Sequence, residues 1–208
     1  MGIKHVYLLE NSLKNLMRTK GIVGTFVLSI LLAIISFFSF NGYLFFSHIQ
    51  KQMLESLEEE TDLIEIQMSG APIMAMTIFK IAAFLIFVAL ILLTIGNMKK
   101  SFKQFLLTQQ KDYQSMALMG ETLSFLTLFY ACQVTLFAVT SMVIGSVLGK
   151  IIFYEAVIKT IQIGLFSDNV NSFKGNYGLS VIAIALSLIY IFVTTFVGGK
   201  KQIQAYES

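Results

Sequence analysis

The chain has 208 residues, of which 56% are apolar and only 13% carry a charge. Because a soluble domain averages about 25% charged residues, this composition excludes an ordinary water-soluble protein and predicts a membrane protein. The net charge of +3 is small, and no nucleic-acid partner is expected. The single cysteine, Cys132, rules out a disulfide within the chain.

Residues 1–20 are expected to form an amphipathic helix that lies along the cytoplasmic membrane surface. Val6, Leu9 and Leu13 fall on one face of such a helix, while Lys4 and Arg18 lie away from its centre. The apolar run that follows is too long for the core of a secretory signal, and no small-residue cleavage site ends it. That run is therefore predicted to be a retained first membrane span.

Four stretches are long and apolar enough to cross a bilayer, which takes about 20 residues in a helix. They are residues 21–47, 73–96, 122–149 and 179–197. Pro72, the only proline, comes just before the second stretch, where a helix start tolerates it. The predicted fold class is an all-α membrane protein with four transmembrane helices, an N-terminal interfacial helix and a small external segment.

The placement of lysine and arginine predicts the orientation, because short cytoplasmic loops are enriched in basic residues. Segments 1–20, 97–121 and 198–208 are basic, whereas segment 48–72 has one lysine against six acidic residues. Both termini and the middle loop are therefore expected to be cytoplasmic, and segments 48–72 and 150–178 external. The basic residues of the three cytoplasmic segments are Lys4, Lys14, Arg18, Lys20, Lys99, Lys100, Lys103, Lys111, Lys200 and Lys201.

The two external segments are expected to hold little independent structure. Segment 48–72 is predicted to extend the first helix by a few turns, and the weak alternation in residues 62–68 is compatible with a short strand. Its acidic cluster at residues 58–62 is interpreted as a solvated face rather than a metal site. In the second segment, residues 154–166 are expected to form an interfacial or re-entrant helix.

One charged side chain, Lys80, and one glutamine, Gln133, lie inside the predicted spans. Lys80 is about seven residues inside the second span, where it either snorkels to the outer interface or serves as a functional charge in a pathway. Gln133 lies in the third span, and its amide is expected to face a protein neighbour rather than acyl chains.

Small residues recur on one face of the third span. Ser141, Gly145 and Gly149 are spaced four residues apart, which places them on the same side of a helix. Small residues at this spacing allow two membrane helices to approach closely. The sequence leaves open whether that contact is within the chain or across a dimer axis.

No catalytic constellation is present in the sequence. The two histidines, His5 and His48, are predicted on opposite sides of the membrane, and none of the common hydrolase, redox, metalloprotease or phosphate-binding motifs occurs. We therefore expect no enzyme activity, no cofactor and no metal site in this chain, and any energy input has to come from a partner.

One stretch, KDYQSMALMGETLSFLTLFYACQVTLFAVTSMVIGSVLG (residues 111–149), resembles the signature of the FtsX/MacB-like permease family of ABC transporters, the mechanotransmission type (type VII). In that family a short cytoplasmic helix opens with a basic–acidic pair and ends at a glycine before a span rich in small residues. The segment SLKNLMRTKGIVGTFVLSILLAIISF (residues 12–37) is similar to the family's amphipathic opening helix and first span. The positions that match the helix signature, or lie on the same predicted helix, are Lys111, Asp112, Tyr113, Met116, Ala117, Met119 and Gly120.

The resemblance implies a short four-span permease subunit that couples to a separate ABC-type ATPase, which would bind the ATP and magnesium. Residues 111–120 would dock on that ATPase, and closure of the ATPase pair would move the spans and external segments. A homodimer, or a heterodimer with a second permease, is expected, and the substrate would be apolar or peptide-like.

Two other functions remain open from the residues themselves. The chain is alternatively a signalling or immunity protein of the membrane, in which loop 97–121 binds another cytoplasmic partner. A further alternative is an ion channel or carrier that uses Lys80 and Gln133.

Overall fold

The computed structural model describes residues 22–59, 63–108, 114–116, 118–120, 122–163 and 177–207. The predicted N-terminal amphipathic helix (residues 1–20) lies outside this range. So do four candidate residues of the coupling segment, Lys111, Asp112, Tyr113 and Ala117.

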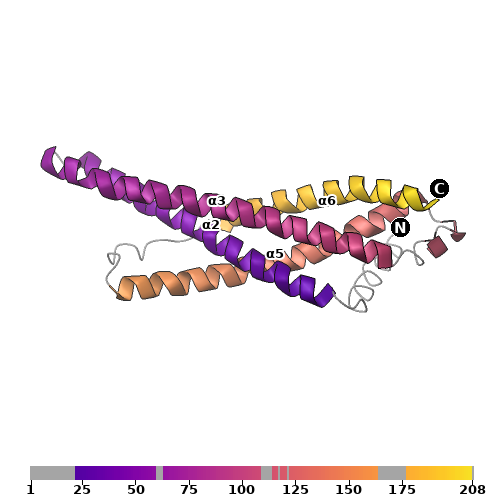
Figure 1. Cartoon of the computed structure of the whole chain (residues 1–208). Helices are drawn as coiled ribbons and strands as arrows, with labels where there is room; N and C mark the ends of the chain where they lie inside the picture. The colour runs from indigo at the N-terminus through magenta and orange to yellow at the C-terminus, as the bar shows by residue number, and fades with distance from the viewer. Residues whose placement is uncertain are drawn as a thin grey trace.

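Four long helices make up most of the described chain: α2 (Ile22–Glu59), α3 (Leu63–Thr108), α5 (Leu123–Gln162) and α6 (Tyr177–Glu207). Each contains a stretch long and apolar enough to cross a membrane, and no strand is present in the described residues. For the described residues, the prediction of an all-helical fold with four helices long and apolar enough to cross a membrane is confirmed. Successive helices run in opposite directions along roughly one axis, and α2 crosses α5 (Figure 1).

The helices are longer than the predicted spans. α2, α3 and α5 have 38, 46 and 40 residues, which at 1.5 Å per residue correspond to about 57, 69 and 60 Å. A hydrocarbon core is only about 30 Å thick, so these helices must tilt or extend beyond it. At one end α2 and α3 form a helical hairpin that reaches well past the start of α6 (Figure 1). We call this the hairpin end, and the opposite end, with Lys99, Lys103 and Lys200, the basic end.

The hairpin end differs from the expected short external segment. α2 continues to Glu59, as the predicted extension of the first helix requires, but α3 already begins at Leu63. The expected strand at residues 62–68 is therefore wrong for residues 63–68, which are helical. Pro72 lies inside α3 rather than at its start. Residues 70–72 are exposed, and the proline removes one hydrogen bond from the helix at this point.

The interfacial or re-entrant helix expected at residues 154–166 is not a separate element in the described part. α5 runs without a break to Gln162 and ends with Ile163 as its C-cap. No glycine or proline interrupts residues 150–162, and Phe153, Val157 and Ile161 continue the face that packs on α2. That continued packing explains why α5 extends beyond its predicted end. Residues 164–176 lie outside the described range.

The core is divided along the length of the molecule. At the basic end a large cluster joins α3, α5 and α6, with Phe26 of α2 packed against it. In the middle, Phe37 and Phe40 of α2 pack with Phe87 of α3. Towards the hairpin end the buried cluster is small and comes from α2 and α5 only. Its members are Phe45, Ile49 and Phe153. The basic end thus has the larger share of the core.

Candidate functional site: the basic end of the helices

The predicted coupling segment ends at a glycine whose backbone requires that residue type. Gly120 has φ +89°, a left-handed conformation that other residues rarely adopt. The Met119 amide donates to the Ser115 carbonyl at 3.1 Å, which closes one helical turn before the glycine. Thr122 then caps α5 by accepting a hydrogen bond from the Phe125 amide. A short helical turn, a glycine stop and a capped start therefore redirect the chain into the third span.

The apolar residues of this turn point in different directions. Met116 is partly buried and packs against the core of the basic end. Leu118 and Met119 are 89% and 78% exposed. Sequence reasoning selected Met116 and Met119 as equivalent contacts and passed over Leu118, although Leu118 lies in the same stretch. Of the described residues here, Leu118 and Met119 present the apolar surface that a protein partner can cover.

The small-residue face of the third span lies against α2 of the same chain. A Cβ atom on Gly145 would clash with Ala33 and come within 2.9 Å of its carbonyl carbon. A Cβ atom on Gly149 would lie 2.6 Å from the Ile34 carbonyl oxygen. Ser141, on the same face, is fully buried. Of the two alternatives left by the sequence, the contact at Gly145 and Gly149 is thus within the chain.

Lys80 and Gln133 both lie in protein environments. Gln133 is fully buried within the helix bundle rather than facing lipid. Lys80 donates to Gln50 Oε1 at 2.5 Å, and Gln50 donates to Thr77 Oγ1 at 2.8 Å. Thr77 in turn donates to the Ile73 carbonyl. The lysine therefore has a partner on α2, one that its sequence position did not reveal.

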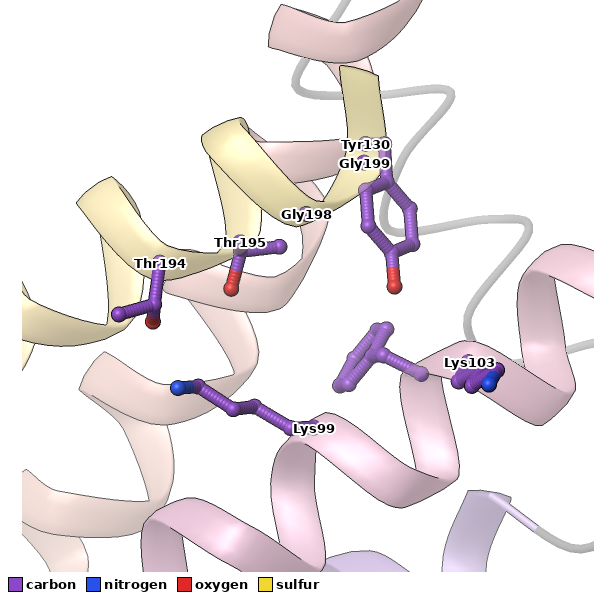
Figure 2. Close-up of a pocket in the computed structure, with 8 residues that line it drawn as sticks. Lys99, Lys103, Tyr130, Thr194, Thr195, Gly198 and Gly199 are labelled. Atoms are coloured by element: carbon purple, nitrogen blue, oxygen red, sulfur yellow. The ribbon is translucent and has the colours of Figure 1, made fainter. Parts of the chain in front are cut away.

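A cavity of about 190 Å³ opens at the basic end between α3, α5 and α6. Figure 2 shows the hydroxyl groups of Tyr130 and Thr195 directed towards α3, from which Lys99 and Lys103 project. The Lys99 ammonium lies 4.7 Å from the centroid of the Tyr190 ring, a cation–π contact. Gly198 and Gly199 complete the wall. The sequence analysis did not identify this site, because its residues come from three separate helices.

A second, apolar groove lies between α2, α3 and α5 towards the hairpin end, with a volume of about 360 Å³. Gly42 forms part of its wall, together with alanine side chains on α3 and α5. Aromatic rings provide most of the remaining surface. They belong to Phe38, Phe45, Phe46, Phe79 and Phe153.

The described residues contain no group of three or more His, Cys, Asp or Glu side chains that can hold a metal ion. Cys132 is half-buried in the third span as a thiol. The described residues offer three surfaces that can bind other molecules: an exposed apolar turn, a basic cavity and an apolar groove.

Comparison with known proteins identifies no relative: no family model, curated protein or solved structure matches this chain.

Proposed function

We propose that this chain is the transmembrane permease subunit of an FtsX/MacB-like ABC transporter. The observation that carries the proposal is the exposed Leu118–Met119 turn, joined through Gly120 and Thr122 to a single 40-residue helix, α5. A force applied to that turn acts on a helix that continues to the opposite end of the molecule. The resemblance of residues 111–149 to the family signature supports the same reading.

The packing of α5 suggests how movement would pass to the rest of the chain. At Gly145 and Gly149 the backbone of α5 approaches that of α2 so closely that a methyl group does not fit. α2 is in turn linked to α3 by the Gln50–Thr77 and Asn97–Ser29 hydrogen bonds, one towards each end. Tilting of α5 would therefore move the α2–α3 hairpin with it, because closely packed helices shift as units rather than deform.

The proposed protein lies in the bacterial cytoplasmic membrane with its basic end and both termini in the cytoplasm. A separate ATPase binds ATP and magnesium and docks on residues 111–120. The permease acts as a homodimer or as a heterodimer with a second permease. The apolar groove lined by phenylalanines favours an apolar or peptide-like substrate, since rings supply contact area without polar groups that need partners.

The test is co-purification of the full chain with the ABC-type ATPase of its own genome neighbourhood, together with ATP hydrolysis in proteoliposomes. The double variant Leu118→Asp/Met119→Asp should reduce association at least about tenfold, because it places charge in an apolar contact. Leu107→Asp is the matched control: Leu107 is an equally apolar, 52% exposed side chain at the same end of the molecule but on α3.

Met116→Asp is a poorer probe than the double variant, because Met116 packs on the chain's own core and its replacement destabilises the fold. Unchanged association of the Leu118→Asp/Met119→Asp variant would contradict the assigned docking turn. Absence of any ATPase partner, with a different cytoplasmic protein retained through the same turn, would favour the signalling or immunity alternative.

A further inference from the structure

The cavity at the basic end carries charge of one sign. Lys99 and Lys103 lie one turn apart on α3 and both line it, and no carboxylate is among its lining residues in the described part of the chain. Lys100, between them in sequence, lines a different groove, between α2 and α3. Two ammonium groups with no carboxylate among the described lining residues make this cavity attractive to an anion.

A buried hydroxyl in the same cavity has no partner. Thr195 is 6% exposed, and its Oγ1 atom makes no hydrogen bond. Threonines in helices usually bond a carbonyl about one turn earlier, and many in this chain do so. They are Thr77, Thr94, Thr127, Thr135, Thr140, Thr160 and Thr194. Thr195 instead leaves its buried hydroxyl unbonded at the cavity wall, next to Thr194 (Figure 2).

The cavity lies where the apolar parts of two spans end. The continuous apolar run of α3 ends at Gly96 and that of α6 at Val197, so Lys99 and Lys103 follow the first within about two turns and Gly198 and Gly199 directly follow the second. This depth corresponds to the lipid headgroups rather than the acyl chains. Directly next to the cavity, α6 exposes apolar side chains that extend back into the span. They include Tyr190, Val193 and Val197, each at least 50% exposed.

We propose that this cavity binds the phosphate group of an anionic phospholipid from the leaflet at the basic end. Lys99 and Lys103 pair with the phosphodiester oxygens, and the Thr195 hydroxyl donates to one of them. The acyl chains lie along the exposed apolar face of α6. Basic pockets between membrane helices recognise anionic headgroups in this way. The site joins α3 to α6, two helices that share few other contacts, and it is independent of whether the chain couples to an ATPase.

The experiment is native mass spectrometry of the purified full chain in detergent, titrated with phosphatidylglycerol or phosphatidylcholine of the same acyl composition. Phosphatidylglycerol should bind more tightly than phosphatidylcholine. Lys99→Gln and Lys103→Gln should each weaken its binding about fivefold, in line with the contribution of one basic residue near an anionic surface. Thr195→Val, which has the same shape without the hydroxyl, should weaken it about threefold.

Lys100→Gln is the matched control, since it removes the same charge at the same depth but outside the cavity, and its effect should stay under about twofold. An equal loss with Lys100→Gln, or equal binding of phosphatidylcholine, would overturn the proposed site.

A third arm of the experiment uses soluble glycerophosphate. If it binds as tightly as phosphatidylglycerol, the site recognises free phosphate compounds and the lipid assignment is wrong. Circular dichroism verifies that each variant keeps the helical fold.

Discussion

The two ends of this molecule differ in how their helices are held. At the basic end, side chains from all four helices meet around one apolar cluster. At the hairpin end the buried cluster is small and joins α2 and α5 only, and a groove opens between α2, α3 and α5. The buried clusters at both ends are built from the same types of residue, phenylalanine above all. The two ends differ in the number of helices that surround these side chains.

This difference matters for a protein proposed to transmit movement. A region joined by four helices moves as one body, whereas three helices with an open groove between them can change their angles at lower cost. The binding features are divided in the same way: the exposed turn and the basic cavity are at the tightly packed end, and the apolar groove is at the other. Three sets of substitutions would sharpen or break this comparison.

The largest effect is expected from removing an aromatic ring from each end. Phe102 is 2% exposed and packs edge-to-face on Phe137 at a centroid distance of 5.1 Å. Phe102→Ala should destabilise the fold by about 3 kcal/mol because it leaves a cavity. Phe79 is 53% exposed and stacks on Phe46, so Phe79→Ala should cost about 1 kcal/mol or less. Unfolding by denaturing detergent, followed by circular dichroism, measures both. Equal losses would show that the two ends are equally packed.

An intermediate effect is expected where α2 and α5 cross. Gly145→Ala and Gly149→Ala should each cost about 2 kcal/mol, because the added methyl group meets backbone atoms of α2 that have no room to move aside. Gly96→Ala is the control, since nothing lies within 4 Å of a Cβ atom there. The single thiol, Cys132, reports unfolding through its rate of labelling on heating. Should the glycine variants change oligomeric state while monomer stability stays constant, the face would belong to a dimer contact instead.

The smallest effect concerns the polar link at the hairpin end. In a double-mutant cycle of Gln50→Leu and Lys80→Met, the coupling energy should be about 1 kcal/mol, because interhelical hydrogen bonds in membranes are worth about that much. Lys51 and Glu55 provide the comparison, since their ion pair at 3.4 Å is within one helix and mostly exposed, and its coupling should be about 0.5 kcal/mol or less. Zero coupling between Gln50 and Lys80 would mean that Lys80 reaches the interface without help from α2.

Sequence reasoning found the four spans because a bilayer demands long apolar helices whatever surrounds them. It placed a helix break at Gly120, and that glycine has a positive φ in the structure. It missed the lengths of the helices: α5 continues past residue 149 because Phe153 packs on α2, a contact that no local pattern reveals. The short strand that the sequence allowed at residues 62–68 is wrong for residues 63–68, because weak alternation in a short segment does not outweigh helical continuity.

The sequence by itself determined that this is an all-helical, multi-span protein with one strongly basic and one acidic end, since composition and charge placement act along the chain. Only the tertiary structure decided which neighbour each residue meets. It turned Met116 inward and Leu118 outward, set Gly145 against α2, paired Lys80 with Gln50, and brought Lys99, Lys103 and Thr195 around one cavity. The physical reason is that these contacts depend on the angles and depths at which separate helices cross, and those are fixed by packing rather than by any single stretch of sequence.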